Sequence, residues 1–84
     1  MNDTHLWKEL IKSAYQYDHL LARNLEGIWL EGTKLIKNKN GKYVLRPFYG
    51  KDSYWKSEKD YKKYTKKYLE PYRDLLIKLL KELE

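Results

Sequence analysis

Residues 27–47 read GIWLEGTKLIKNKNGKYVLRP, and this stretch decides the fold. Within it, Asn40-Gly41 is a strong hairpin signal, because a tight two-residue turn needs the positive φ angles that asparagine and glycine adopt easily. The preceding residues 27–37 are compatible with an extended chain, and residues 42–46 form the returning strand. We therefore expect an antiparallel hairpin sheet of two or three strands.

Single residues of this stretch define the predicted sheet further. Gly32 suits a bulge or a sharp bend, and Pro47 ends the returning strand because proline has no amide hydrogen to donate. Successive side chains of a strand point to opposite faces. One face of the returning strand carries Tyr43 and Leu45, and the other carries Lys42, Val44 and Arg46. This alternation is typical of a sheet with one buried face.

The chain before the hairpin has the apolar spacing of a helix. In residues 4–25, apolar side chains recur mostly at three- and four-residue steps, which places them on one face of a helix that Asp3 or Thr4 can cap. These side chains are Leu6, Trp7, Leu10, Ile11, Ala14, Tyr17, Leu21 and Leu25. Gly27 breaks the pattern, so the predicted helix ends before it.

A second helix is predicted over residues 57–83, where Ser57 and Asp60 have the spacing of a helix cap. Its apolar stripe keeps its phase across Pro71, which favours one kinked helix; the alternative is that Pro71 begins a new helix. The stripe consists of Tyr61, Tyr64, Tyr68, Tyr72, Leu75, Leu79 and Leu83. Together with the hairpin, the helices predict an α+β fold that forms a single domain over residues 1–84.

The composition excludes several classes of function. The chain has no cysteine, so disulfides and thiolate metal sites are excluded, and a reducing, cytoplasmic location is expected. No apolar run approaches the roughly 20 residues that cross a bilayer, and no targeting segment is recognisable. His5 and His19 lie about four turns apart on the first predicted helix, and the glycines lack the spacing of a phosphate-binding loop. We expect no enzyme activity, no metal and no cofactor.

Positive charge is concentrated in the middle of the chain. Residues 34–67 hold twelve of the 18 Lys and Arg against three Asp and Glu, which is a local net charge of +9 in a protein of net charge +6. Eight of the thirteen aromatic residues lie in or beside this stretch, from Tyr43 to Tyr68. A basic surface with interleaved rings indicates an anionic partner.

Lysines on one face of the second helix are the most specific signal. They crowd its N-terminal half, where the helix dipole is already positive and carboxylates are preferred. Arg46 adds a planar fork that can hold a phosphate, and Trp55 adds a ring that can stack on a base. The predicted ligand-binding residues are Arg46, Lys42, Lys51, Trp55, Lys59, Lys62, Lys63, Lys66 and Lys67. The alternatives are a solvated lysine face, protection of edge strands by the hairpin lysines, and a structural role for Trp55 as a staple of its loop.

The charge and the apolar residues support two functional hypotheses. The first is a small, non-enzymatic, basic module that binds a phosphate-bearing ligand, either nucleic acid or a nucleotide. The second is a small inhibitor or adaptor, for example one encoded by a virus or a mobile element, that docks on the acidic surface of a nucleic-acid-handling host protein. The residues predicted for a partner or homodimer interface are Leu76, Ile77, Leu80 and Leu83. Membrane association is not expected, because the tyrosine-rich stripe suits a core.

The order of hairpin and long helix resembles the double-stranded-RNA-binding domain, whose final helix also presents lysines near its start. The doublets Lys62-Lys63 and Lys66-Lys67 carry the resemblance. The third strand and the alanine-rich helix core of that family are missing, and tyrosines stand in their place.

Overall fold

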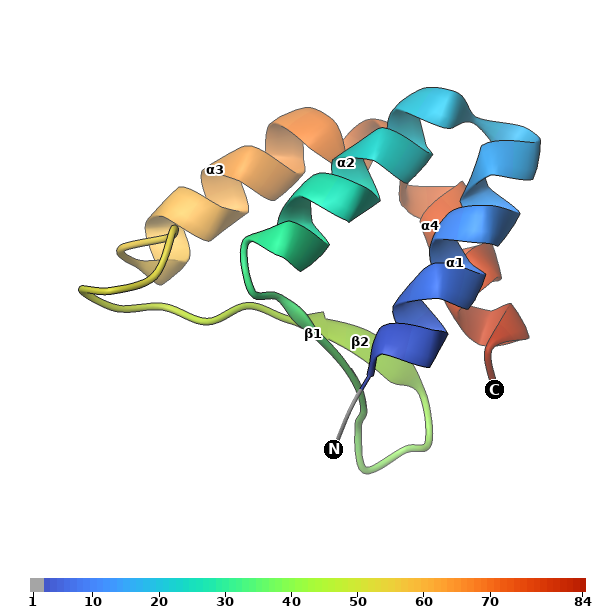
Figure 1. The fold of residues 1–84 in the computed structure, drawn as a ribbon, viewed down its shortest axis with the longest axis horizontal. Helices are drawn as coiled ribbons and strands as arrows, with labels where there is room; N and C mark the ends of the chain where they lie inside the picture. Colours follow the sequence, from blue (N-terminus) through green and yellow to red (C-terminus); the bar gives the residue numbers. More distant parts are fainter. Residues whose placement is uncertain (1–2) are drawn as a thin grey trace.

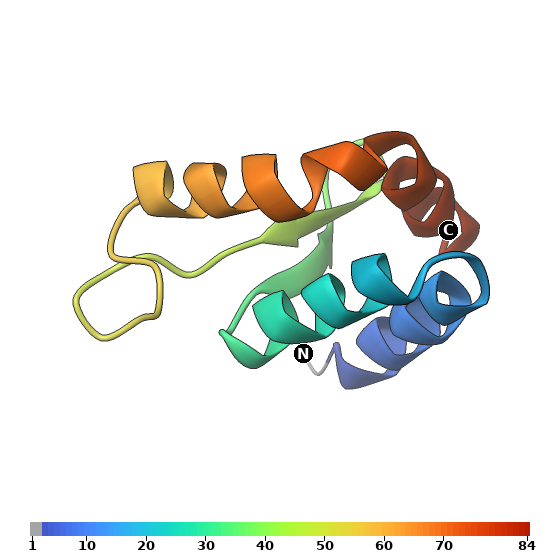
Figure 2. The ribbon, with the colours of Figure 1, turned by 90° about the horizontal axis from the view of Figure 1, so that it is seen from above.

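The computed structural model describes residues 3–84, and the predicted α+β class is confirmed (Figure 1). Seen from above, α3 and α4 form one side of the molecule and α1 and α2 the other, with the hairpin passing beneath them (Figure 2). In chain order the elements are α1 (Thr4–Tyr17), α2 (His19–Leu30), β1 (Lys34–Lys37), β2 (Tyr43–Arg46), α3 (Glu58–Tyr68), the 3-10 turn η1 (Glu70–Tyr72) and α4 (Arg73–Glu82).

The first predicted helix is in fact two helices, and Asp18 divides them. The backbone of Asp18 is extended, with φ −158° and ψ 113°. Its Oδ1 accepts hydrogen bonds from the N–H groups of Leu20 and Leu21 at 2.9 and 3.2 Å, which satisfies donors left free at the start of α2. The chain turns back there, so Tyr17, expected on the core face, is 53% exposed.

Gly27 does not end the helix, contrary to prediction. α2 continues through it to Leu30 and buries Ile28 completely. Glycine costs about 1 kcal/mol in a helix interior, and burial of a large aliphatic side chain outweighs that cost. Of the predicted first strand, residues 27–37, only the last four are therefore strand.

Gly32 closes α2 instead, with the sharp bend that the sequence predicts. Its φ is +93°. Its N–H donates to the carbonyl of Trp29 at 3.0 Å, and the N–H of Thr33 donates to the carbonyl of Ile28 at 3.1 Å. This pair of bonds is the Schellman motif, in which a left-handed glycine satisfies the last carbonyls of a helix.

β1 and β2 pair antiparallel, which confirms the predicted hairpin. The partners across the ladder are Lys34 with Arg46, Leu35 with Leu45, Ile36 with Val44 and Lys37 with Tyr43. Tyr43 and Leu45 pack on the core, as their alternation predicts. The sheet of the described chain has two strands, so the resemblance to the double-stranded-RNA-binding domain does not extend to its third strand.

The turn of the hairpin differs from the predicted two-residue type. Asn38 organises it, because its Oδ1 accepts from the N–H groups of Asn40 at 2.9 Å and Lys42 at 3.1 Å. The carbonyl of Asn38 accepts from Gly41 N–H at 3.0 Å, and its own N–H donates to the carbonyl of Lys42 at 2.8 Å. Gly41 alone of the two expected turn residues has a positive φ, +77°. The loop is therefore the longer kind that ends in a left-handed glycine.

Pro71 divides the C-terminal helix, so the prediction of one kinked helix is wrong and the alternative of a new helix is closer. The predicted cap is confirmed, because Ser57 Oγ accepts from the N–H of Asp60 at 3.3 Å. The last helical bond of α3 runs from Leu69 N–H to the carbonyl of Thr65 at 2.8 Å. Pro71, two residues later, has no N–H to donate to the carbonyl of Lys67, and its ring crowds the preceding turn. α4 therefore leaves in a new direction (Figure 2).

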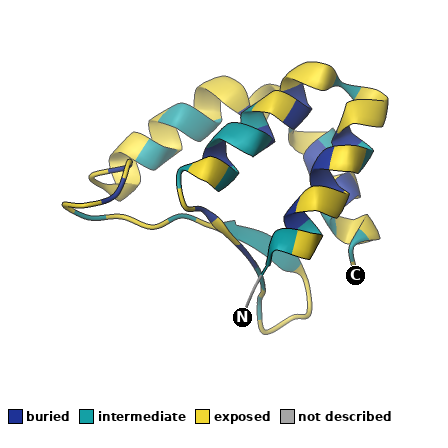
Figure 3. Cartoon of the chain, viewed as in Figure 1, coloured by how far each residue is buried: buried dark blue, intermediate teal, exposed yellow. Residues whose placement is uncertain are grey.

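The core lies where α1, α2 and α4 meet the hairpin (Figure 3). Asp3 joins two of its walls, because its Oδ2 accepts from the Trp7 indole at 3.0 Å and from the N–H of Leu35 at 2.9 Å. The buried apolar residues are Trp7, Leu10, Ile11, Ala14, Leu21, Ala22, Leu25, Ile28, Leu35, Trp55, Leu69, Leu76 and Leu79. No helix of the described chain is long and apolar enough to span a membrane.

Candidate functional site

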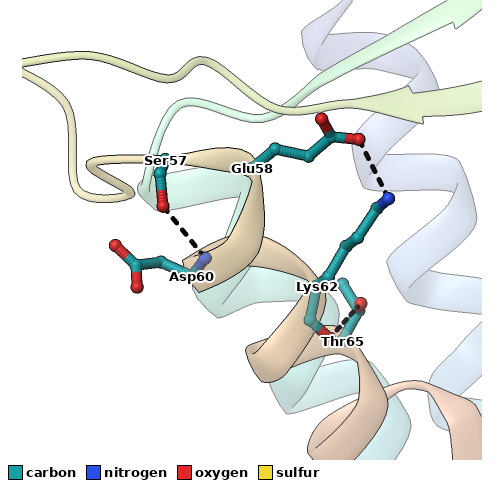
Figure 4. Close-up of polar contacts among 5 residues, drawn as sticks. All are labelled: Ser57, Glu58, Asp60, Lys62 and Thr65. Atoms are coloured by element: carbon teal, nitrogen blue, oxygen red, sulfur yellow. Dashed lines mark hydrogen bonds and ion pairs between the residues drawn. The ribbon is translucent and has the colours of Figure 1, made fainter.

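The exposed face of α3 is the most basic surface that one element presents. Lys59, Lys62, Lys63, Lys66 and Lys67 are all exposed, and α3 buries no residue (Figure 3). One of the five is paired: Lys62 Nζ lies 3.1 Å from Glu58 Oε1 (Figure 4). Both partners are exposed, so this ion pair contributes little to the stability of the fold. Along the described chain the other four lysines form no ion pair, and their charge stays available to a ligand.

Shallow grooves flank this lysine face on both sides. On one side Lys62 and Lys66 line a groove of about 510 Å³ that continues to Arg73. On the other side Lys63 and Lys67 line a groove of about 340 Å³. The lysines therefore straddle α3, so a strand of phosphates can contact either edge of the helix or cross it.

Two exposed tyrosines distinguish the second groove, which we name the Tyr54–Tyr68 groove. Tyr54 is 60% exposed and Tyr68 is 37% exposed, and both line it together with Lys63 and Lys67. Lys67 Nζ lies 5.3 Å from the centroid of the Tyr68 ring. Tyr68 also packs against Tyr64, with ring centroids 4.6 Å apart. Rings and ammonium groups thus occur side by side, as surfaces that bind single-stranded nucleic acid require.

Trp55 does not offer a stacking face, which contradicts its predicted role as a ligand-binding residue. It is 2% exposed, and three tyrosine rings surround it: Tyr61 at 5.0 Å, Tyr54 at 5.3 Å and Tyr64 at 5.9 Å between centroids. The alternative role as a staple of the loop fits this burial. Its neighbour Tyr54 presents the exposed ring, which the sequence does not distinguish from Trp55.

The inner tyrosines of this cluster are neutral at physiological pH, as tyrosines ordinarily are, and burial moves their pKa further from that range. Burial raises the pKa of Tyr61 to about 12. It also raises the pKa of Tyr64, with smaller contributions from Tyr68, Tyr54 and Glu31. These phenols therefore add no negative charge beside the lysines at physiological pH.

The loop before α3 uses one lysine for structure. Lys56 Nζ donates to the carbonyl of Lys51 at 2.7 Å and to that of Ser53 at 3.1 Å. Ser53 Oγ donates in turn to the carbonyls of Gly50 and Trp55. Lys51 itself stays exposed, as its predicted ligand role needs.

The hairpin residues predicted for the same ligand lie on other elements. Arg46, at the end of β2, is exposed and stands opposite Lys34. Lys42 lines a different groove, between β2 and α4. The structure thus places the α3 lysines on one face and gives the hairpin a basic surface of its own.

The predicted apolar interface on α4 needs one correction. Leu76 belongs to the buried core and is not available to a partner. Ile77 is 54% exposed, and with Leu80 it lines the groove beside β2, whose volume is about 530 Å³. Leu83 is half-buried against the core.

Residues 3–84 show no cluster of side chains suited to a metal ion. These residues contain no group of three or more His, Cys, Asp or Glu that could hold a metal ion. His5 and Glu9 form an exposed pair at 3.8 Å, and His19 contacts the ring of Tyr15. No protein-family model matches the chain, and comparison with curated proteins and with solved structures gives no significant match. Only the residues themselves therefore bear on its function.

Proposed function

We propose that the protein is a small, non-enzymatic module that binds a phosphate-bearing ligand, and that single-stranded nucleic acid suits its surface best. One observation carries the proposal: the unpaired lysines of α3 lie beside two exposed tyrosine rings in the Tyr54–Tyr68 groove. Phosphates satisfy the lysines and bases stack on the rings, each stacking contact contributing about 1 to 3 kcal/mol.

The placement of the lysines supports binding over stability. Lys59, Lys62 and Lys63 stand near the positive end of the α3 dipole, where Glu58 and Asp60 are the only carboxylates of the first turn. Like charges at helical spacing also repel by some tenths of a kcal/mol per pair. A bound polyanion removes this repulsion, so binding should stabilise α3.

Fluorescence anisotropy tests the proposal. The ligands are a fluorescein-labelled oligothymidine of about twelve nucleotides, a duplex of the same length and ATP. We expect the single strand to bind most tightly, with a slope of about −0.7 in log affinity against log salt for each neutralised phosphate. Failure of all three ligands to bind at low salt would refute the proposal.

A charge-matched pair of variants locates the site. The double variant Lys63→Glu/Lys67→Glu should weaken oligothymidine binding by about tenfold or more, because both lysines line the groove. The control is Lys8→Glu/Lys12→Glu, which makes the same change in net charge on exposed residues of α1. An equal loss in both variants would mean that net charge, not this groove, drives binding.

The second candidate function is docking to a protein as an inhibitor or adaptor, and the groove between β2 and α4 favours it. Exposed Ile77 beside half-buried Leu80 gives this groove an apolar wall. Its lining shares no residue with the Tyr54–Tyr68 groove. Substitutions in one groove therefore test one function without changing the other groove. If substitution of Ile77 abolished nucleic-acid binding, both functions would use the same surface.

A further inference from the structure

The outer edge of β2 presents unused main-chain groups. The N–H of Asn38 bonds to the carbonyl of Lys42, and hydrogen-bonded pairs alternate along an antiparallel ladder. Val44 and Arg46 therefore bond to β1, whereas the N–H and C=O groups of Tyr43 and Leu45 point away from it. Such a row of free donors and acceptors is a template for another strand.

The outer edge of β1 already has a hydrogen-bond partner at Leu35, the residue paired with Leu45. The N–H of Leu35, which points away from β2, donates to Asp3 Oδ2 at 2.9 Å. No hydrogen bond within the described residues occupies the N–H of Tyr43 or Leu45. Of the two edges, β2 is the one left open over its length.

A groove runs along this open edge. Tyr43, Val44 and Leu45 form one wall, and Ile77 and Leu80 of α4 form the other. Its volume of about 530 Å³ has room for several residues of an extended chain. Apolar side chains of such a chain would lie against Ile77, which is otherwise 54% exposed.

The positive charge of the hairpin indicates which kind of extended chain can bind at the edge of β2. Residues 34–46 contain five Lys and Arg and no Asp or Glu. Lys42 immediately precedes β2 and Arg46 ends it. Both are exposed, and both point to the same face because they are an even number of residues apart. An added strand would place its own side chains directly opposite them, where carboxylates attract and cations repel.

A second copy of this protein fits the edge poorly. The register that uses both outward residues, Tyr43 against Leu45 of the other copy, places Lys42 opposite Arg46 twice. Moving the register by two residues in one direction brings Pro47, which has no N–H, opposite Tyr43; the other direction runs into the turn at Gly41. Self-pairing is thus disfavoured by charge or by lost hydrogen bonds.

From these observations we infer that the β2 edge binds an extended acidic segment of another protein by strand addition. Carboxylates of the segment face Lys42 and Arg46, and its alternate apolar side chains enter the groove beside Ile77. Main-chain bonds to Tyr43 and Leu45 supply affinity, and the charges select the partner. The site is independent of the nucleic-acid surface proposed on α3.

Titration of the isotope-labelled protein with a synthetic peptide tests this inference by NMR. The peptide is blocked at both ends and alternates glutamate with valine; the control peptide has lysine in place of glutamate. We expect the acidic peptide to shift the amide resonances of Tyr43 and Leu45, to slow their hydrogen exchange, and to bind about tenfold or more tightly than the lysine peptide. No shift with the acidic peptide, or equal binding of both peptides, would overturn the inference.

Two variants keep the test specific to the groove. Ile77→Glu adds a negative charge to the wall and should weaken binding of the acidic peptide by about tenfold or more, while oligothymidine binding to α3 is unchanged. Leu30→Glu is the matched control, since Leu30 is 83% exposed and lies outside this groove. Equal loss in both variants would contradict the site. So would a concentration-dependent dimer that Ile77→Glu dissolves, because the occupant would then be a second copy.

Discussion

The Tyr64 hydroxyl lies 3.5 Å from the position that a β-carbon would take on Gly27, so α3 reaches α2 where α2 has no side chain. That distance is an ordinary van der Waals contact. Gly27→Ala should therefore fit, and alanine favours the helix by up to about 1 kcal/mol. We expect a higher urea midpoint for this variant. A lower midpoint would mean that the two helices cannot accommodate one methyl group.

Gly32→Ala is the opposite case. Gly32 has a φ of +93°, which an L-residue adopts only with strain. We expect this variant to lose about 1 to 2 kcal/mol of unfolding free energy in the same urea experiment. Equal stability of the two variants would contradict the Schellman closure of α2.

Among the carboxylates near the surface, we expect Asp18 to make a large contribution to the free energy of unfolding. Its side chain caps α2 and its extended backbone separates α2 from α1. Asp18→Ala should cost about 1 kcal/mol, and Asp18→Asn, which keeps an oxygen acceptor, should cost less. Thermal unfolding of the three proteins measures the difference. An alanine variant as stable as the parent would show that the break between the helices does not depend on this cap.

Trp55 allows a test of its structural role. Its indole N–H is buried and has no acceptor within residues 3–84. Trp55→Phe removes that unsatisfied donor and keeps a ring, so we expect a loss of under about 1.5 kcal/mol, against about 3 to 5 kcal/mol for Trp55→Ala. If Trp55→Phe kept full stability but lost oligothymidine binding, the ring would be a ligand contact after all.

Local signals explain which parts of the fold are predictable from sequence. The hairpin and the Ser57 cap depend on residues within a few positions of each other, and both are confirmed. The apolar spacing does not predict the break at Asp18, because it runs through this residue without a change of step. The cost of a helical glycine is local and predicts a break at Gly27, whereas the burial of Ile28, which outweighs that cost, depends on the packed core.

The candidate site shows the same division. Helical periodicity correctly predicts that the α3 lysines are exposed. It also assigns Tyr68 to the core, but this residue ends α3 and is 37% exposed. Tyr54 and Trp55 are adjacent in an irregular loop, where no period indicates which ring is buried. That choice depends on contacts with Tyr61 and Tyr64 made only in the folded chain.

Because of Tyr61, the stability of the fold should depend on pH in the alkaline range. Burial raises its pKa from 10.0 to about 12 in the folded protein. Below pH 10 the phenol is neutral in both states and the folded state keeps its full stability; between pH 10 and 12 the unfolded chain ionises first, so stability falls. We expect Tyr61→Phe to lose less stability over this window than the parent does. Thermal unfolding of both proteins across this pH range measures the losses of stability. Equal losses in the two proteins would contradict the raised pKa of Tyr61.

Stacking and charge on α3 can be separated by their response to salt. Tyr54→Ala and Tyr68→Ala should each weaken oligothymidine binding by about 1 to 3 kcal/mol without changing the salt slope, because a lost ring releases no counterion. Lys63→Gln and Lys67→Gln should each reduce the magnitude of that slope by about 0.7.

The control for the rings is Tyr17→Ala, because Tyr17 is 53% exposed on α1 and lies outside the Tyr54–Tyr68 groove. If it weakens binding as much as Tyr68→Ala does, the rings contribute no site-specific stacking. If the tyrosine variants change the slope as the lysine variants do, the groove is being remodelled instead of losing a base contact. The pattern expected of a true single-strand surface is a loss of affinity at constant slope for the rings, and a loss of slope for the lysines, because bases meet the rings while phosphates meet the ammonium groups.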